Sequence, residues 1–237
     1  MKFAVLSDIH SNSFALEAVL AEVAAGRPDR VVVLGDTFGY YPWAEKTWRL
    51  IQPLDVFAVL GNHDQLVLDA APPDPEPVYW ELAKQNEREL KENAPEAIAW
   101  LRTLSPRAEL ALDGRRIICC HGTPADPLNG RYYPDNPQDP SGGPAAGEIL
   151  LLGHTHYPLV RTLASGGLVI NPGSVGQPRD GDLRASWGWL FPQESRFEPV
   201  RTEYDVAAAV KLLTQRGWCK LAIEALRKDY RGRLKPQ

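Results

Sequence analysis

The first sixty residues alternate short apolar runs with longer segments in which apolar residues recur at helical spacing. The apolar runs at 2–6, 30–34 and 56–60 each end in polar or glycine residues, which is typical of buried strands. The segments between them, 11–25 and 44–51, carry the helical periodicity and are predicted to be helices. Strands and helices that alternate at these lengths form a parallel sheet with crossover helices. This part of the chain is therefore predicted to be α/β.

The order of elements changes further along the chain. A helix is predicted over 78–104, split near Pro95, and a hairpin is predicted for 110–112 and 115–120. Later strands are expected at 148–152, 159–163, 168–170, 185–191 and 196–201, followed by helices at 206–216 and 221–230.

The whole chain, 1–237, is expected to form a single domain, because no composition shift or repeat divides it. Within that domain a helical segment covers about 70–105, and its first residues, 70–77, hold four prolines and are predicted to be an extended loop. A second stretch at about 123–147 is rich in Pro, Gly, Asp and Asn and has no periodicity. Connections of that length are functional or disordered, and this one is expected on the side of the active site.

Charge and composition exclude several classes of protein. Charged residues make up 24% of the chain and hydrophobic residues 44%, which excludes wholesale disorder. A formal net charge of −4 argues against strong nucleic-acid binding through a basic field. No apolar run approaches the roughly 18 residues of a bilayer span, so no membrane association is expected. Three cysteines, two of them adjacent, cannot build a disulfide framework, and a cytoplasmic location is expected.

All five histidines lie in short polar phrases that follow predicted strands. These phrases are Asp8-Ile9-His10, Gly35-Asp36, Gly61-Asn62-His63-Asp64, Cys119-Cys120-His121-Gly122 and Gly153-His154-Thr155-His156. Ligand sites of open parallel sheets lie outside the carboxyl ends of the strands. We therefore expect the five phrases to meet in one place.

The residue types in these phrases suit a pair of divalent metal ions. Imidazole and carboxylate ligands bind Mn, Fe, Zn, Co or Ni, and no sulfur-rich pattern is present. Asp8 and His10, two apart on an extended chain, point the same way and can chelate one ion. His154 and His156 have the same spacing, although a turn between them would aim them at different ions. A carboxylate such as Asp36 can bridge two cations about 3.5–4 Å apart.

Taken in order, these five phrases resemble the five motifs of the calcineurin-like metallophosphoesterase superfamily. The phrases 35–40 and 171–179 resemble its small prokaryotic phosphodiesterase-like, or diadenosine-tetraphosphatase-like, branch, and the likeness runs from residue 1 to about residue 205. The resemblance implies a four-layer α/β/β/α sandwich of two mixed β-sheets flanked by helices.

The resemblance also implies a set of metal ligands and two divalent cofactor ions. Asp8, His10 and His156 would hold the first ion. Asn62, His121 and His154 would hold the second, with Asp36 between the two. Manganese is the first expectation for both ions, with Fe, Zn, Co or Ni as alternatives.

The activity implied is hydrolysis of phosphodiester bonds, and of phosphomonoesters as an open possibility, by a hydroxide that bridges the two metals. His63 would stabilise the transition state and act as a general acid. Asp64 would either orient the His63 ring or cap a helix that follows the motif. The substrate is expected to be a small phosphoester, nucleotides included.

Three residues are candidates for substrate binding, each beside a simpler interpretation. Arg179 either belongs to a turn between strands or reaches a phosphate oxygen. Arg131, in the long loop, is either solvated or holds a phosphate or base, and Tyr40 follows the Asp36 strand and is a candidate for the pocket wall.

Competing functions remain at this point. One is hydrolysis of a dinucleoside polyphosphate, which would need a basic groove that scattered arginines do not supply; another is a protein or nucleotide phosphatase. A non-enzymatic interaction module on the same fold is disfavoured, because such relatives lose metal ligands and every ligand type is in place here. The oligomeric state, the native metal and the physiological substrate are not determined by the sequence.

Overall fold

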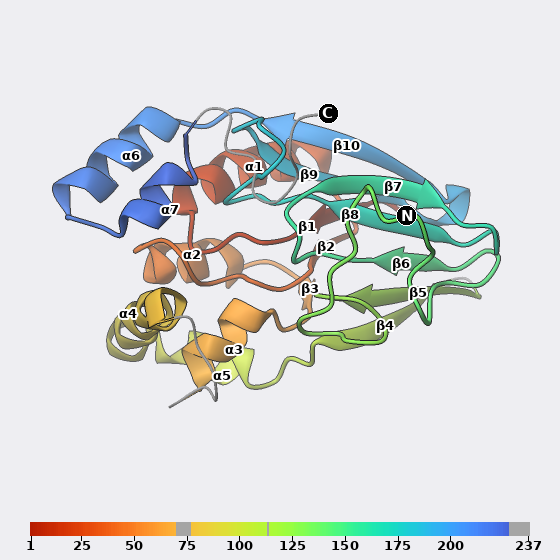
Figure 1. Cartoon of the computed structure of the whole chain (residues 1–237), viewed down its shortest axis with the longest axis horizontal. Coiled ribbons are helices and arrows are strands. Elements are labelled where there is room, and N and C mark those ends of the chain that lie inside the picture. Colours follow the sequence, from red (N-terminus) through yellow and green to blue (C-terminus); the bar gives the residue numbers. More distant parts are fainter. Residues whose placement is uncertain (70–76, 113, 228–237) are drawn as a thin grey trace.

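Two five-stranded mixed β-sheets form the frame of the protein (Figure 1). The computed structural model describes residues 1–69, 77–112 and 114–227. In the first sheet the N-terminal strands pair in parallel, and two later strands extend it in antiparallel orientation. Its order is β10 (Arg196–Thr202), β9 (Ala185–Phe191), β1 (Phe3–Leu6), β2 (Arg30–Val33) and β3 (Val56–Ala58).

The second sheet has a parallel centre and an antiparallel strand at each edge. Its order is β4 (Arg107–Leu112), β5 (Arg115–Cys120), β6 (Ile149–Leu151), β8 (Leu168–Pro172) and β7 (Pro158–Thr162). No helix or strand interrupts residues 121–148, all of which are described and which run as turns and bends between β5 and β6.

Helices lie at the ends and flanks of the sheets, and in Figure 1 most of them are at the left, whereas most strands are at the right. They are α1 (Ser13–Gly26), α2 (Ala44–Ile51), α3 (Asn62–Leu68), α4 (Pro77–Asn93), α5 (Pro95–Leu101), the short 3-10 helix η1 (Pro192–Glu194), α6 (Val206–Gln215) and α7 (Lys220–Glu224). Within the described ranges, no helix has both the length and the apolar character needed to cross a membrane.

Side chains alternate between the two faces of each sheet, and this alternation builds the layers. In β1, Phe3 and Val5 pack between the sheets, whereas Ala4 and Leu6 face the cluster that includes α1. The second sheet contributes its own alternate residues to the layer between the sheets, Ile117, Cys119, Ile149, Leu151 and Ile170. The opposite face of that sheet packs against Tyr132 of the 121–148 segment. The α/β fold of two mixed sheets flanked by helices is thus confirmed.

Most predicted elements are present, and three differences have a physical origin. The periodicity of the sequence did not predict α3, which was offered only as one of two alternatives for Asp64, because the strand-end phrase from Asn62 onward is itself the first turn of that helix. β4 begins at Arg107, three residues before the predicted start, because its backbone continues the antiparallel pairing with β5. α7 ends at Glu224, before the predicted residue 230, and the predictions for 70–76 and 228–230 lie outside the described residues.

The layer between the sheets sets the stability of this frame. Leu151 is fully buried there, so Leu151→Ala removes apolar contacts and leaves a cavity, at an expected cost of about 2–5 kcal/mol in the free energy of unfolding. Val160 on β7 is 49% exposed, and Val160→Ala should cost less than about 0.5 kcal/mol. Urea unfolding followed by circular dichroism measures both, and equal losses would contradict this packing.

Candidate metal centre

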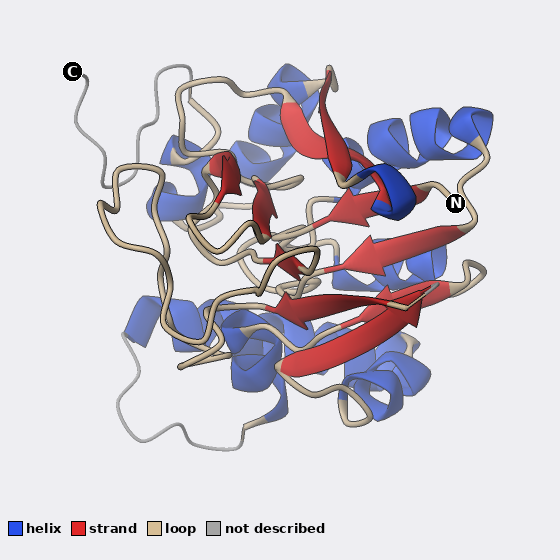
Figure 2. Cartoon of the chain, turned by 90° about the vertical axis from the view of Figure 1, so that its right-hand side faces the viewer, coloured by secondary structure: helices blue, strands red, loops and turns tan. Residues whose placement is uncertain are grey.

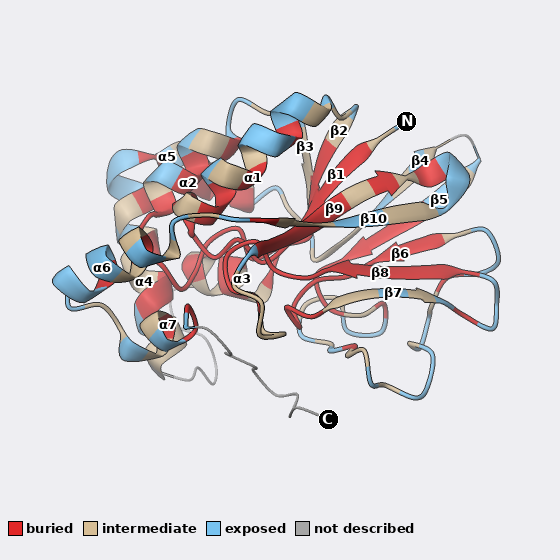
Figure 3. Cartoon of the chain, turned by 90° about the horizontal axis from the view of Figure 1, so that it is seen from above, coloured by how far each residue is buried: buried red, intermediate tan, exposed pale blue. Residues whose placement is uncertain are grey.

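The loops that follow the strands β1, β2 and β6 are joined by hydrogen bonds to one another. The His10 N–H donates to the carbonyl oxygen of Asp36 (2.8 Å), and the His63 N–H donates to Asp36 Oδ1 (2.8 Å). The His154 N–H donates to Asp8 Oδ2 (3.1 Å). Figure 2 shows loops gathered where several strands end, and Figure 3 shows buried loop segments between the helices and the strands. The Gly153 N–H donates to the carbonyl oxygen of His121 (2.9 Å), so all five polar phrases meet at one place, as the sequence predicted.

Left-handed backbone conformations are concentrated in these loops. Among the described residues, eight that are not glycine have positive φ, and five of them are predicted metal ligands. Those five are Asp8 (φ 52°), His10 (51°), Asp36 (51°), His154 (64°) and His156 (65°). Each such conformation costs about 1 kcal/mol or more, and strained backbone of this kind gathers at functional sites.

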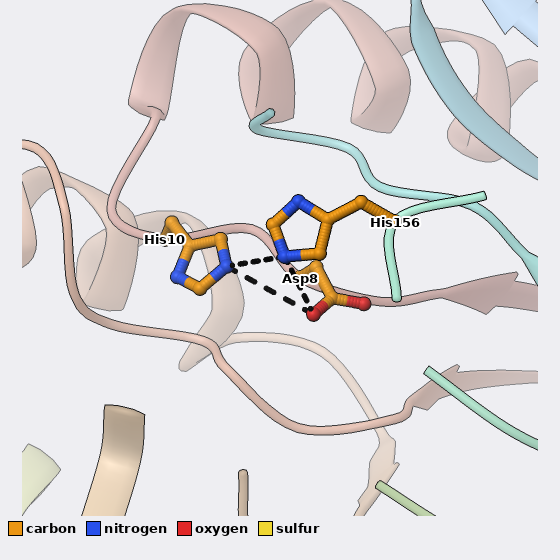
Figure 4. Close-up of side chains that lie close together, drawn as sticks. All are labelled: Asp8, His10 and His156. Carbon is orange, nitrogen blue, oxygen red and sulfur yellow. Dashed lines mark hydrogen bonds and ion pairs between the residues drawn. The ribbon is translucent and has the colours of Figure 1, made fainter. Parts of the chain in front are cut away.

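One group of donors comprises Asp8, His10 and His156, whose side chains turn toward one another in Figure 4. The Nε2 atoms of His10 and His156 lie 3.1 Å apart. Asp8 Oδ1 is 3.2 Å from Nε2 of His156 and 3.9 Å from Nε2 of His10. All three residues are buried.

A second group comprises Asp36, His121 and His154, and Asn62 adjoins it. Nε2 of His121 lies 3.0 Å from Asn62 Oδ1 and 3.2 Å from Nδ1 of His154. Asp36 Oδ2 stands between the groups, 3.6 Å from Nε2 of His10 and 3.4 Å from Nε2 of His121. The structure therefore brings all seven predicted ligands together.

The donor atoms of these residues do not all find hydrogen-bond partners among themselves, and their chemistry suits divalent metal ions. Within the described part of the chain, Asp8 Oδ1, which faces His10 and His156, is buried without a hydrogen-bond partner. Unsatisfied buried polar atoms are costly, and each deserves a physical explanation. Carboxylate and imidazole donors crowded in this way are the ligands that Mn, Fe, Zn, Co and Ni accept.

Burial and neighbouring charges shift the pKa values of these groups in different directions. Burial lowers the pKa of His154 to about 3 and holds the pKa of His10 well below its usual value. Burial also lowers the pKa of His121, but the Asp36 carboxylate, the Asp8 charge and the hydrogen bond to the Leu34 carbonyl together raise it to about 9. Burial raises the pKa of Asp36, yet His121 and His63 keep it well below its ordinary value. The Asp36 carboxylate is therefore ionised, and His10 and His154 are uncharged and able to donate a lone pair.

Main-chain carbonyls and one hydroxyl orient the donor side chains. Nδ1 of His121 donates to the carbonyl oxygen of Leu34 (2.7 Å), and Nδ1 of His156 donates to that of Gln177 (2.6 Å). Ser7 Oγ donates to Asp8 Oδ2 (2.6 Å). Such partners fix the ring orientation and tautomer of a metal-ligating histidine. Sequence reasoning missed them, because a carbonyl oxygen carries no residue-specific signal.

His63 and Asp64 occupy the first turn of α3 beside the two donor groups. The His63 ring is 8% exposed, and its centroid lies 4.9 Å from that of His10. The Asp64 carboxylate accepts hydrogen bonds from the N–H groups of Thr37, Phe38 and Gly61. Within the described residues it makes no hydrogen bond to the His63 ring. The contact with Gly61, the residue before α3, is that of a helix-capping carboxylate.

The three predicted substrate-binding residues differ in their distance from the donors. The Tyr40 ring lies 4.7 Å from the His10 ring and 4.8 Å from the His63 ring. Nη2 of Arg179 donates to the Tyr40 hydroxyl (3.3 Å) and to Gln177 Oε1 (3.1 Å). Arg131 is exposed; its charge contributes to the low pKa of His154, but within the described chain no direct contact joins it to the donors.

This fold and these clustered donors define the class of metal-dependent phosphoesterases. Residues 1–187 match the sequence model of the calcineurin-like phosphoesterase superfamily domain. The chain therefore belongs to the calcineurin-like phosphoesterase superfamily, whose members are metal-dependent hydrolases of phosphoric esters.

Individual relatives extend over nearly the whole chain. An uncharacterized protein of Methanocaldococcus jannaschii is 33% identical in an alignment 227 residues long, and the match covers 90% of this chain and 91% of that protein. The crystal structure of a metallophosphoesterase from Sphaerobacter thermophilus is 29% identical, covers 95% of this chain and 98% of its own, and has a TM-score of 0.73. A hypothetical protein of Pyrococcus horikoshii shares the fold, with 20% identity, coverage of 98% and 99%, and a TM-score of 0.83.

Close backbone approach at Gly61 yields a test of this arrangement. A Cβ at this position would collide with the backbone N and with Oδ1 of Asp36. Gly61→Ala should therefore lower the free energy of unfolding by about 1–3 kcal/mol, through forced movement of the Asp36 loop. Thermal unfolding in the presence of EDTA measures this cost without any metal contribution.

Gly114 provides the control. Its φ is 78° and no atom lies within 4 Å of the Cβ that alanine would add, so Gly114→Ala carries a conformational cost alone, whereas Gly61→Ala, at a φ of −94°, carries the steric cost alone. A Gly61→Ala protein as stable as the parent would contradict the close approach.

Proposed function

We propose that this protein is a dinuclear metal-dependent phosphoesterase that hydrolyses small phosphodiesters, nucleotide-containing ones included. The observation that carries the proposal is the position of Asp36 Oδ2, within 3.6 Å of His10 and 3.4 Å of His121, between the two donor groups. A carboxylate so placed is suited to bridge two cations.

Each ion has its own set of donors in this proposal. Asp8, His10 and His156 hold the first ion, and Asn62, His121 and His154 hold the second, with Asp36 shared between them. When bound, two divalent ions lower the pKa of a shared water and neutralise negative charge on phosphate oxygens. Manganese is the first candidate, and Fe, Zn, Co and Ni suit the same donors.

His63 is proposed to assist the leaving group. Burial lowers the pKa of His63 to about 4, so the ring is uncharged at neutral pH in the metal-free protein and carries one N–H. A phosphate anion bound in front of the ring favours its protonated form through the opposite charge. The resulting imidazolium, protonated from solvent, donates that proton to the leaving oxygen as the ester bond breaks and returns to the neutral imidazole. Asp64 supports this step indirectly, because it fixes the backbone before α3 and after β2.

Tyr40 and Arg179 are proposed to line the substrate side of the site. The Arg179 guanidinium beside the Tyr40 hydroxyl can receive a phosphate oxygen. Arg131 reaches the site only through its electrostatic field. Because few basic side chains lie near the site, a singly charged phosphodiester suits it better than a polyphosphate chain does.

Metal removal and Asp36→Ala test the metal centre. Chelation should abolish hydrolysis of bis(p-nitrophenyl) phosphate, and added Mn²⁺ should restore it. Mn²⁺ at a hundred times its Kd should stabilise the parent by about 2.7 kcal/mol for each ion bound, and Asp36→Ala should lose both this stabilisation and activity. Asp55→Ala removes an exposed carboxylate and serves as the control. Activity that survives in the metal-free protein would contradict the proposal.

His63→Ala separates turnover from metal binding. Loss of the proton donor should lower kcat by about 10²–10⁴-fold, and less for a p-nitrophenyl leaving group than for an alkyl one, which needs a proton more. The Mn²⁺ Kd, measured by calorimetry, should stay within about threefold of the parental value, since His63 is not a proposed ligand. Parental rates on both esters, or loss of the metal, would show that this role is wrong.

A further inference from the structure

Helix α4 places one polar side chain on its buried face. Leu82, Ala83 and Leu90 on this face pack into neighbouring apolar clusters, and Asn86 lies among them, completely buried. An amide in such a position is unfavourable unless its hydrogen bonds are made. The hydrogen-bond partners of Asn86 therefore indicate its structural role.

The Asn86 amide is fully satisfied, and its partners lie mainly in the loops of the metal centre. Its Oδ1 accepts hydrogen bonds from Ser11 Oγ (2.6 Å) and from the Gly39 N–H (3.1 Å). Its Nδ2 donates to the carbonyl oxygens of Tyr41 (3.1 Å) and Leu82 (3.1 Å). Three of these four contacts leave the helix.

The contacts of Asn86 flank two groups of the site. Ser11 directly follows His10, and both residues have left-handed φ angles of 60° and 51°. Gly39 and Tyr41 lie on either side of Tyr40, whose ring is 4.7 Å from the ring of His10. The Asn86 side chain thus connects the loop of His10, a proposed metal ligand, with the loop of Tyr40, which is proposed to line the substrate side of the site.

The space between these loops leaves little room for movement. A Cβ added at Gly39 would lie 2.9 Å from Nδ1 of His10. On the other side of the loop, Nε1 of Trp218 donates to the carbonyl oxygen of Tyr40 (2.9 Å). A shift of the Gly39–Tyr41 backbone therefore presses directly on His10.

We propose that Asn86 is a positioning residue that sets the placement of His10 and Tyr40 relative to one another, and with it the geometry of the first metal site. This inference rests on the proposed metal centre and phosphoesterase function. Asn86 acts through Ser11 and the Gly39–Tyr41 backbone and contacts neither metal nor substrate itself. Hydrogen-bond partners behind metal ligands are typically worth 10- to 100-fold in metal affinity or activity.

Asn86→Ala, with Co²⁺ as the probe, tests the proposal. Co²⁺ Kd from equilibrium dialysis and the visible ligand-field spectrum report the His10 geometry without reference to activity. We expect a Kd about tenfold higher, an altered spectrum, and a kcat on bis(p-nitrophenyl) phosphate lower by about 10- to 100-fold with KM nearly unchanged.

Trp48→Phe is the matched control for lost helix packing. Trp48 is buried in the same helical region, and its Nε1 donates to Glu96 Oε1 (3.1 Å), a contact between α2 and α5. This variant should lower the melting temperature while it keeps the parental Co²⁺ Kd, spectrum and kcat.

Ser11→Ala gives a second, milder variant that keeps the test decisive if Asn86→Ala fails to fold. It removes the Ser11 Oγ contact alone, so it should shift the Co²⁺ Kd and spectrum in the same direction but less. The double variant should be no worse than Asn86→Ala, because both changes break the same connection.

The outcomes distinguish this proposal from the proposed function. Parental Co²⁺ affinity, spectrum and kcat in Asn86→Ala and Ser11→Ala, with only a lower melting temperature, would overturn the positioning role and leave the phosphoesterase intact. A parent that binds Co²⁺ and hydrolyses no ester would refute the function, whereas the Co²⁺ readouts of the variants would still decide the role of Asn86.

Discussion

The Asp36 carboxylate is the group on which the arrangement of the site depends. Oδ1 accepts the His63 N–H, Oδ2 faces both His10 and His121, and the main-chain carbonyl of the same residue accepts the His10 N–H. One residue therefore connects the loops after β1, β2 and β3 with a histidine that follows β5. A buried carboxylate that stays ionised needs cationic partners, and histidine neighbours provide only part of that charge. A pair of bound cations would complete it.

The loops around Asp36 are costly to form and are held by the rigid frame behind them. Left-handed conformations at Asp8, His10 and Asp36 and the unpaired Oδ1 of Asp8 each oppose folding. The apolar layer between the sheets and the hydrogen bonds that extend the β1–β2 pairing, such as Asp8 N–H to the Gly35 carbonyl (3.1 Å), offset these costs. Strained loops held by a rigid frame are typical of a site preorganised for its ligands.

The local sequence pattern predicts much of the frame, but it does not predict features that depend on contacts between distant segments. Alternation in β1 separates Phe3 and Val5 from Ala4 and Leu6, and this separation can be predicted because a strand has a period of two. Helix α3 was left as an alternative only, since Gly61 and Asn62 are typical of a strand end, whereas in the structure the Asp64 carboxylate accepts the Gly61 N–H and caps a helix. Asn86 was missed for a related reason: a single polar residue on a helix is ordinarily solvated, and only the folded chain shows it to be buried.

The sequence by itself determined which chemical groups the site contains: the carboxylates, the imidazoles and the amide of Asn62, each placed directly after a strand, where backbone geometry brings strand ends to one edge. Only the tertiary structure decided which groups lie next to one another and how each side chain is oriented. Asp36 stands between two donor groups, the carbonyls of Leu34 and Gln177 orient two imidazoles, and Arg179 lies beside Tyr40 while Arg131 stays exposed. The reason is physical, because residue identity is a local property, whereas distances between loops depend on how separate strands pack, and every backbone carbonyl is chemically alike until the fold places it.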